Sequence, residues 1–502
     1  MHYFLGIDIG TTHTKAVLLS GAGIPVFETR QGYELLRPQP GYEEQDVAVI
    51  MEAVTRVIGD AVAAAPQGHA PAAIGFSAAM HSLLPVDTNG DPLYNALTWA
   101  DTRSAQEAEE LKRHPGAAGV YSNTGIPFHP MSPLCKIVWF RKHRPDIFEK
   151  AAKFISIKEY VLFRLLGKYI VDYSVAAATG LFSIRENNWD AQALQLAGID
   201  AQKLSQPVPA THCEYELATL YSHLAGNNMI SFVAGASDGC LANFGSGAVE
   251  HGQTALTIGT SGAVRMTVRL PAASPDHLSG AQGLFTYPLT GDLYVRGGAI
   301  NNGGIVLKWL SSLFLQAGQA EEESYAELLA LAARAPAGAN GLVFLPYLLG
   351  ERAPVWDAGA RGAFVGLTMN HGRADMVRAA LEGICFSLGQ LIALLEKAHG
   401  PVQEIYASGG FTRSAFWLQL LADITGKPMR ISSTADASAA GAAFLAMLAT
   451  GHLKDPADVR QWIQAGELYY PDPGNRAVYA RLSGVFNSLY PKLKDEFAVL
   501  SI

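Results

Sequence analysis

The chain has 502 residues, of which 49% are hydrophobic and 16% charged, so it can form two or three domains with large buried cores. Its 37 basic and 45 acidic side chains give a net charge of −8, which argues against nucleic acid as a partner because phosphate neutralisation needs a basic face. The four cysteines form no CxxC pair, and we find neither a signal-peptide start nor an uncharged apolar stretch of about 18 residues. We therefore expect a cytoplasmic protein that has no membrane partner.

The first half begins with a predicted β-meander. Gly10-Thr11-Thr12 interrupts an apolar opening run, and a second glycine-bearing turn follows at residues 21–23. Apolar residues at helical spacing come next. The elements predicted here are strands at 3–9, 13–19, 24–28 and 73–77 and a helix at 46–65.

A similar strand–turn–strand unit lies near the middle of the chain. Its turn is Gly259-Thr260-Ser261-Gly262, between predicted strands at 253–258 and 263–268. The two Gly-Thr-(Thr/Ser) turns are roughly half a chain apart and each follows an apolar strand, which indicates a duplicated unit at the start of two similar domains. We expect domains over residues 1–245 and 246–502.

The second half contains further predicted elements. They are a helix at 373–397, a strand that ends at Ala407, and a helix at 437–449 whose alanines and glycines suit close packing.

The first glycine turn has residue types that can bind a phosphate. A carboxylate such as Asp8 at a strand end can hold Mg²⁺, usually through water, and Gly10 lets the backbone approach. The amides and hydroxyls of Thr11 and Thr12 can donate to phosphate oxygens. An ordinary hairpin turn with Asp as turn former is the alternative.

Two further glycine turns extend this hypothesis. Gly259 to Gly262 would be the other half of a polyphosphate clamp if the two hairpins faced each other across a cleft. Ser408-Gly409-Gly410 would let a purine lie against the backbone. Each is also compatible with an ordinary turn. The sequence contains no GxxxxGK[ST] or GxGxxG pattern, so those phosphate-binding loops are not expected.

Another group of residues in the first half could bind and deprotonate a hydroxylated ligand. Asp238 follows a predicted strand at 230–234 among small residues, where a carboxylate could act as general base, although a helix N-cap is the alternative. Met80-His81 and Trp99 to Arg103 offer apolar surface with hydrogen-bonding tips, which suits a polyol, but lone His and Trp residues are more often structural.

These residues lie in patterns that resemble the FGGY family of carbohydrate kinases over nearly the whole chain. Residues 131–139, Met-Ser-Pro-Leu-Cys-Lys-Ile-Val-Trp, are similar to its first signature, and residues 362–382 to its second. The resemblance implies an α/β fold of two actin-like, ribonuclease-H-like domains with ATP and Mg²⁺ in the cleft between them. The implied nucleotide contacts are Asp8, Gly10, Thr11, Thr12, Lys15, Gly259, Thr260, Ser261, Gly303, Gly409, Gly410 and Arg413. The implied acceptor contacts are Met80, His81, Trp99, Asp101, Arg103, His129 and the base Asp238, with Asp8 and Asp238 at the metal.

Within the family, several stretches are most similar to gluconate kinases, among them residues 77–82, 127–131, 301–305 and 350–354. The expected reaction is in-line transfer of the γ-phosphoryl group of ATP to a terminal hydroxyl of gluconate, and a xylulose kinase or another ketose or polyol kinase is the alternative. A chaperone-type ATPase and a sugar-sensing pseudokinase are further alternatives, and a homodimer is allowed.

A gluconate carboxylate needs a cation or several donors nearby. Arg103, Lys158 and His129 are the candidates, and for Lys158 we favour a solvated helix position. His13 in the first turn has no assigned role: it either touches phosphate or faces solvent.

Overall fold

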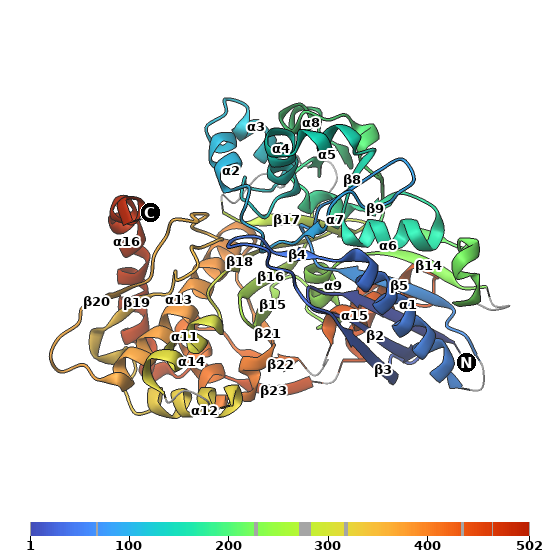
Figure 1. Cartoon of the computed structure of the whole chain (residues 1–502). Coiled ribbons are helices and arrows are strands. Elements are labelled where there is room, and N and C mark those ends of the chain that lie inside the picture. Colours follow the sequence, from blue (N-terminus) through green and yellow to red (C-terminus); the bar gives the residue numbers. More distant parts are fainter. Residues whose placement is uncertain are drawn as a thin grey trace.

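The computed structural model describes residues 2–66, 69–224, 229–270, 283–315, 320–432, 436–463 and 465–500. In these residues two large mixed sheets, one from each half of the chain, stand on either side of a pair of central helices (Figure 1). The first sheet has the strand order β13-β14-β5-β1-β2-β3. Its strands are β1 (Tyr3–Ile9), β2 (His13–Ser20), β3 (Pro25–Gly32), β5 (Ala73–Ala78), β13 (Cys213–Glu214) and β14 (Ser231–Ser237).

The second sheet repeats the core of the first. Its order is β17-β18-β16-β15-β21-β22-β23, and in both sheets an antiparallel three-stranded meander is extended by two parallel strands. The prediction of a duplicated unit is therefore confirmed. The strands are β15 (Gln253–Ile258), β16 (Gly262–Arg269), β17 (Phe285–Thr290), β18 (Leu293–Ile300), β21 (Glu404–Ser408), β22 (Met429–Ser432) and β23 (Ala465–Tyr469).

Strand β1 is buried along its whole length because a helix covers each of its faces. Tyr3, Leu5, Ile7 and Ile9 share a core with the helix α1 (Val47–Ala64), which Asp46 caps by accepting a hydrogen bond from the amide of Ala48. The alternate residues belong to the opposite face, so the two-residue period of a strand serves two cores.

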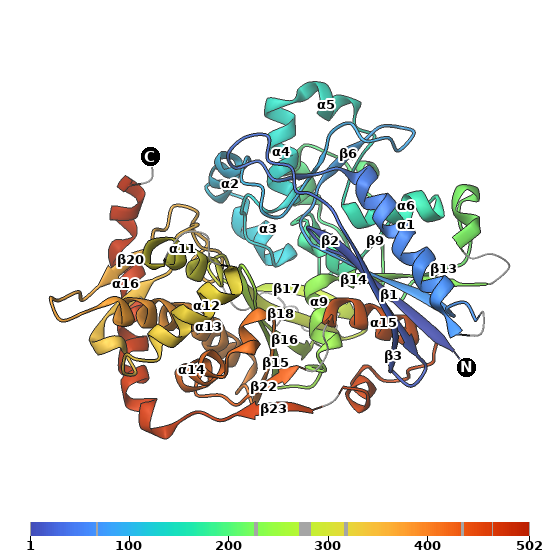
Figure 2. The same ribbon diagram turned by 60° about the horizontal axis from the view of Figure 1, so that its bottom comes forward.

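Helices α9 (Asp238–Gly245) and α15 (Ala437–Ala449) lie between the two sheets (Figure 2). Although α15 belongs to the second half, it packs on β1 and β5 of the first sheet. The approach is so close that a Cβ at Gly6 would lie 1.8 Å from the Ala439 carbonyl oxygen. The alanine and glycine content of this predicted helix thus lets the two halves meet.

A cap of short elements covers the first sheet at the top of Figure 1, and a helical layer surrounds the second sheet. The cap contains α2 (Ala105–Lys112), α3 (Ala117–Thr124), α4 (Pro133–His143), α5 (Pro145–Lys150), α6 (Ile157–Leu166), α7 (Tyr173–Ala178) and α8 (Ala191–Ala197). The two-stranded sheets are β4 (Glu44–Gln45) with β7 (Ala96–Leu97), β6 (Leu84–Val86) with β8 (Lys153–Ile155), β9 (Ile170–Asp172) with β12 (Gln206–Val208), β10 (Phe182–Ser183) with β11 (Asn188–Trp189), and β19 (Val343–Leu345) with β20 (Ala363–Val365). The helical layer around the second sheet contains α11 (Ile305–Phe314), α12 (Glu321–Ala332), α13 (Arg373–His399), α14 (Ala415–Thr425) and α16 (Arg476–Leu500).

Helix α13 is the one helix of the described residues that is long and apolar enough to cross a membrane, with a mean hydropathy of 1.5 over its most apolar window. That window is 72% buried inside the protein, against the second sheet and the helices around it. Its apolar character is explained by this core position.

Candidate active site

Asp8 lies near the end of β1, in the strand and before the turn. Its Oδ1 accepts a 2.7 Å hydrogen bond from Ser77 Oγ on the parallel strand β5. Burial, together with the negative charges of Asp436 and Asp238, raises the pKa of Asp8 to about 7. Asp8 is therefore a buried strand carboxylate near two others and does not act as a turn former.

The first hairpin turn is held by three side chains from outside it. Tyr33 donates its hydroxyl hydrogen to the Gly10 carbonyl at 2.7 Å. Gln45 Nε2 donates to the Thr11 carbonyl at 2.7 Å, and Trp99 Nε1 donates to Thr11 Oγ1 at 3.1 Å. The position of Thr11 is thus fixed by both the sheet and the cap.

The remaining predicted residues of this hairpin are more accessible. Thr12 and His13 are exposed, and their side chains lie 3.0 Å apart between Oγ1 and Nδ1. The exposure of His13 is compatible with both of its predicted alternatives, so its role stays a prediction. Lys15 forms a 2.8 Å ion pair with Asp436, the residue that caps α15.

The second hairpin turn packs against a second pair of glycines. The amides of Gly303 and Gly304 donate to the carbonyls of Thr260 and Gly259 at 3.2 and 2.7 Å. A Cβ at Gly303 would lie 2.5 Å from the Ser261 carbonyl oxygen, so only glycine allows this approach.

The equivalent strand pairs β1–β5 and β15–β21 each carry a side-chain hydrogen bond at the same position, but between different chemical groups. In the second sheet Thr257 occupies the place of Asp8, and its Oγ1 lies 2.7 Å from Ser408 Oγ on the parallel strand β21. A hydroxyl pair in one half thus replaces the carboxylate–hydroxyl pair of the other, so only the first half presents a negative charge at this position.

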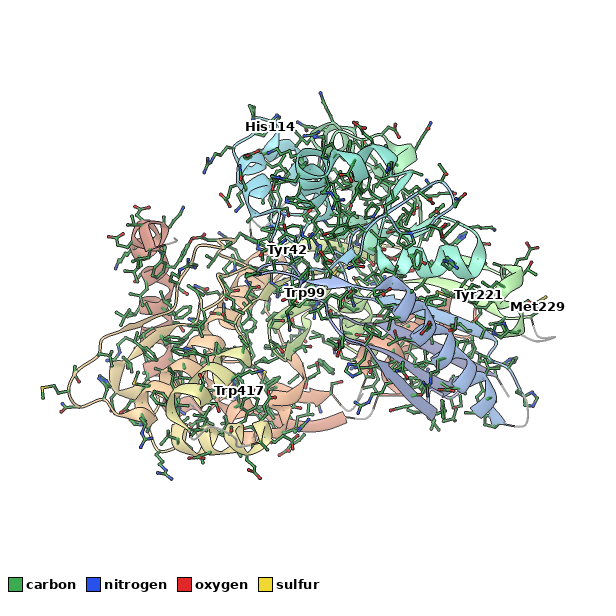
Figure 3. The ribbon with its side chains drawn as sticks, in the orientation of Figure 1. Tyr42, Trp99, His114, Tyr221, Met229 and Trp417 are labelled. Carbon is green, nitrogen blue, oxygen red and sulfur yellow. The ribbon has the colours of Figure 1, made fainter. Side chains whose placement is uncertain are left out.

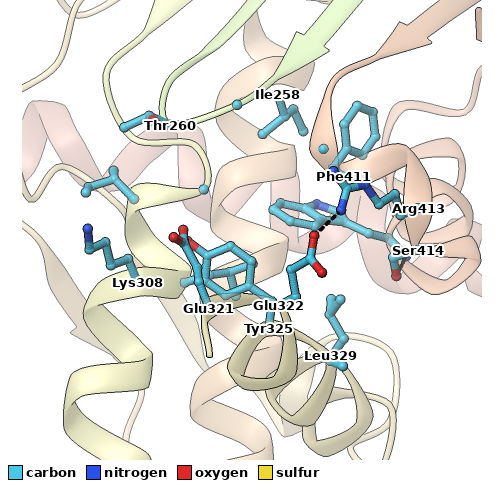
Figure 4. A pocket seen from close by; sticks show the side chains of 17 residues that line it. Ile258, Thr260, Lys308, Glu321, Glu322, Tyr325, Leu329, Phe411, Arg413 and Ser414 are labelled. Carbon is cyan, nitrogen blue, oxygen red and sulfur yellow. Dashed lines mark hydrogen bonds and ion pairs between the residues drawn. The ribbon is translucent and has the colours of Figure 1, made fainter. Parts of the chain in front are cut away.

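A large cavity of about 730 Å³ lies on one side of the second hairpin (Figure 4). Thr260 and Lys308 stand at one end of it, and Phe411, Arg413 and Ser414 stand at the other. Its lining residues are Ile258, Gly259, Thr260, Gly304, Ile305, Leu307, Lys308, Glu321, Glu322, Tyr325, Ala326, Leu329, Gly410, Phe411, Arg413, Ser414 and Trp417.

Three predicted nucleotide contacts lie in or beside the lining of the large cavity. Gly410 and Arg413 line the large cavity, and Arg413 forms an exposed 2.6 Å ion pair with Glu322 of α12. Gly409 lies next to the lining, packed against the Ile258 carbonyl.

The same hairpin also lines a small cavity of about 280 Å³, which is shared by the two halves. Thr11 of the first hairpin and Ser261 of the second both line it, together with Asp238. The two predicted turns therefore meet at one crevice. Its lining residues are Thr11, Met80, His81, Trp99, Met131, Asp238, Ser261, Gly262, Ala263, Arg265, Phe285, Tyr287, Ala299, Arg352 and Trp356.

Asp238 is the first residue of α9, and the capping role that it could have had belongs to Ser237, whose side chain accepts from the amide of Cys240. Burial raises the pKa of Asp238, while the charge of Arg265 and a hydrogen bond from the Gly239 amide act in the opposite direction. The N-cap interpretation of Asp238 is therefore wrong, and its carboxylate is left to line the cavity.

His81 presents one defined nitrogen to the small cavity. It has a φ of 65°, and its Nδ1 lies 2.7 Å from the Ala178 carbonyl, so Nδ1 carries the proton and Nε2 can accept. Burial and the charge of Lys136 lower the pKa of His81 to about 3. The imidazole is therefore neutral, and its Nε2 can accept a hydrogen bond from a hydroxyl group.

Lys136 of α4 holds the two segments that carry the cap side of the small cavity. Its fully buried Nζ donates to the carbonyls of His81 at 2.7 Å and Thr98 at 2.6 Å. Trp99, which follows Thr98, lies close to Tyr42 where the cap meets the sheets, whereas Trp417 lies within the second half (Figure 3).

Asp101 and Arg103 are placed close to the small cavity but pair with each other. Arg103 Nη2 lies 2.7 Å from Asp101 and 2.6 Å from Glu44, and its guanidinium stacks 3.7 Å above the Tyr42 ring. Neither side chain is among those that line the cavity.

His129 and Lys158 are also kept from the cavity by other contacts. His129 is buried behind Trp356, with ring centroids 5.7 Å apart. Lys158 is buried and donates to Asp172 at 2.7 Å and to the Ala236 carbonyl at 3.1 Å. The expectation of a solvated Lys158 is wrong because its ion-pair partner lies inside the cap.

The sequence reasoning missed Arg265, Arg352, Tyr287 and Asp436. Arg265 was detectable as the one charged residue inside the apolar run 263–268. Arg352 lies in the stretch 350–354, whose similarity to gluconate kinases did not by itself indicate a role for this side chain. Asp436 was detectable through the duplication, since it precedes α15 as Asp238 begins α9.

The described residues contain no group of three or more His, Cys, Asp or Glu side chains arranged for a metal ion. Asp8 and Asp238 are close enough for their charges to interact, which fits the one or two carboxylates that accompany phosphate oxygens around Mg²⁺.

Two family models match the chain. The N-terminal domain of the FGGY family of carbohydrate kinases matches residues 3–245, and the C-terminal domain of that family matches residues 254–450. The chain belongs to the FGGY family of carbohydrate kinases. Its two-domain α/β structure is accordingly of the actin-like class, and the chain is a sugar kinase that uses ATP.

Individual FGGY kinases match along their full length. A gluconokinase of Bacillus licheniformis is 40% identical over 99% of this chain and 98% of its own. The crystal structure of a gluconate kinase from Lactobacillus acidophilus has a TM-score of 0.92 at 36% identity, with 100% of both chains covered. A xylulose kinase of Staphylococcus epidermidis (strain ATCC 12228 / FDA PCI 1200) is 31% identical over 98% of this chain and 97% of its own.

Proposed function

We propose that this FGGY kinase transfers the γ-phosphoryl group of ATP to the terminal hydroxyl of D-gluconate, giving 6-phosphogluconate. The observation that carries the proposal is that the second hairpin lines both cavities. Gly259 and Thr260 line the large cavity, and Ser261 lines the small one. A nucleotide in the large cavity would therefore extend its phosphates towards an acceptor in the small cavity.

The large cavity suits the nucleoside part of ATP. Tyr325, Phe411 and Trp417 offer aromatic surface, and Gly410 leaves room for a flat base against the backbone. The hairpin amides and hydroxyls, with Lys15 nearby, would meet the phosphates.

Asp238 would act as general base in the small cavity. A general base works best when its pKa lies near the operating pH, and burial raises the pKa of Asp238 in that direction. The charge of Arg265 favours the ionised form of Asp238, which is the form that accepts a proton. It would accept the proton of the acceptor hydroxyl as this oxygen attacks the γ-phosphorus, and His81 Nε2 and Trp99 would orient the polyol. Asp8 and Asp238 would hold Mg²⁺, which supplies positive charge to the phosphates.

Domain closure around the substrates would exclude water and suppress ATP hydrolysis.

The boundary near residue 245, a homodimer and a cytoplasmic location stay predictions. Asp101, Arg103 and His129 support the cavity walls in this proposal.

A coupled ADP-release assay with gluconate, xylulose and glycerol tests the assignment. Gluconate should give the highest kcat/KM. A preference for xylulose would replace gluconate as the substrate, and ATP turnover that is independent of any sugar would contradict the kinase proposal.

A further inference from the structure

Two arginines in the small cavity form no ion pair among the described residues, although Asp238 and Glu351 are near enough for their charges to act on Arg265 and Arg352. Arg265 lies on β16, and Arg352 lies in the loop between β19 and β20. The Nε atom of each is buried without a hydrogen-bond partner, and Arg265 makes no side-chain hydrogen bond or ion pair within the described part of the chain. Arg352 Nη2 donates only to the Ile300 carbonyl, at 3.1 Å. Both guanidinium groups therefore have donors to spare.

The other buried arginines with ion pairs show what is missing here. Arg103 is neutralised by Asp101 and Glu44, and Arg378 is paired with Glu382 at 2.8 Å. Burying a cation without an acceptor is costly, so proteins usually pair it. An acceptor brought by a ligand would satisfy Arg265 and Arg352 in the same way.

The small cavity also has an excess of positive charge. Asp238 is the one acidic residue in its lining, against the two arginines, and His81 is neutral. Burial lowers the pKa of Arg352 to about 10, the adjacent Glu351 acts against this shift, and the charge of Arg265 adds to it, so the two guanidinium groups are near enough to repel each other. An anion placed between them would relieve this repulsion, which a neutral ketose or polyol would not do.

We propose that Arg265 and Arg352 together bind the carboxylate of an open-chain sugar acid and so select it over neutral sugars. This inference rests on the function proposed above. A carboxylate has two oxygens that accept hydrogen bonds from planar guanidinium groups, with a geometry that hydroxyls do not match. Trp99 lies 5.1 Å from the Arg352 guanidinium and would cover the carbon chain beside it.

The transferring phosphoryl group is the other anion that could meet Arg265. This side chain packs on the first turn of α9, where a Cβ at Gly239 would lie 2.7 Å from its Nε, next to Asp238. The experiment must therefore separate binding of the acceptor from transfer of the phosphoryl group.

The test uses the full chain with Arg265→Gln, Arg352→Gln and the control Arg269→Gln. Arg269 lies on the same strand as Arg265 but is exposed and paired with Asp292. Gluconate and its neutral counterpart glucitol are titrated into the ADP-bound protein in a calorimeter. Turnover is then measured with gluconate and xylulose at saturating ATP.

Each Gln variant is expected to raise the Kd of gluconate about 10- to 100-fold, the usual effect of losing a charge-assisted hydrogen bond. The Kd of glucitol and the KM of ATP should stay within about threefold, as for Arg269→Gln. Arg265→Lys and Arg352→Lys keep the charge but lose the fork, so a smaller rise is expected. If the Gln variants unfold below the assay temperature, the Lys variants are used in the binding test in their place.

An unchanged Kd of gluconate in both the Gln and Lys variants would overturn the inference. So would an equal loss of kcat with gluconate and xylulose at unchanged gluconate affinity, since that result assigns the arginines to the phosphoryl group. A wild-type protein that phosphorylates xylulose and not gluconate would instead refute the proposed function, so the two failures are distinguishable.

Discussion

The buried Lys136 should make the stability of this kinase depend on pH in a defined window. Burial lowers the pKa of Lys136 from 10.5 to about 7. In the unfolded chain the same ammonium keeps its ordinary pKa, so between about pH 7 and 10.5 the unfolded state binds more protons. The free energy of unfolding therefore rises with pH across this window, and the contribution is lost as the pH falls towards 7.

The size of the effect follows from the same values. A pKa difference of this size corresponds to on the order of 5 kcal/mol between the ends of the window, or about 1.4 kcal/mol for each pH unit. Lys136→Met removes this dependence. It also leaves the carbonyls of His81 and Thr98 without their donor, which costs roughly 1–3 kcal/mol for each buried group. Near pH 7 the two effects of the substitution oppose each other, and near pH 10 only the loss of the hydrogen bonds remains.

Urea unfolding of the wild type and Lys136→Met at pH 6, 7, 8, 9 and 10 measures the difference. The advantage of the wild type should grow from pH 7 to pH 10, and the KM for gluconate should rise in the variant because the His81 segment is no longer held. Lys142→Met, at the half-exposed end of the same helix, is the control and should show a difference that does not grow with pH. A wild-type advantage that is constant from pH 6 to pH 10 would refute the reasoning.

Three further substitutions test the nucleotide and acceptor sites. Asp238→Asn should lower kcat about 10²- to 10⁴-fold while calorimetry finds ATP binding intact, and near-normal turnover would remove Asp238 as the base. Gly303→Ala places a methyl group 2.5 Å from the Ser261 carbonyl, so the KM of ATP should rise about tenfold or more in the coupled assay, with Gly304→Ala for comparison. Arg413→Ala breaks an exposed ion pair, so the melting temperature should hardly move while the KM of ATP rises; no change in that KM would exclude Arg413 from the nucleotide site.

The parts of the fold that were predictable are those in which one local pattern decides the structure. The strand at Gln253–Ile258 and the helix at Ala437–Ala449 end where the sequence placed them, because a glycine turn limits the first and a run of small residues defines the second. Strand β3 extends to Gly32, beyond the predicted 24–28, because it pairs with β2 at an edge where apolar content is not required.

The parts of the site that were not predictable depend on partners far away in the sequence. Whether Lys158 is solvated depends on Asp172, which the fold brings beside it inside the cap. Arg265 and Arg352 face one cavity although 87 positions separate them in the sequence. The side-chain type at each position was visible, but which charges would be left unpaired is a property of the packed structure.

The duplication explains why the two halves can share a fold and still divide the chemistry. Thr257 pairs with Ser408 where Asp8 pairs with Ser77, so the second half carries no carboxylate at the strand end and its large cavity can receive a polyanion without repulsion from that position. The acidic residues at the starts of α9 and α15 also differ in their ion pairs. Asp436 is engaged by Lys15, whereas Asp238 lines the small cavity without an ion-pair partner among the described residues. The carboxylate that a bound acceptor can reach is therefore the one that no ion pair holds.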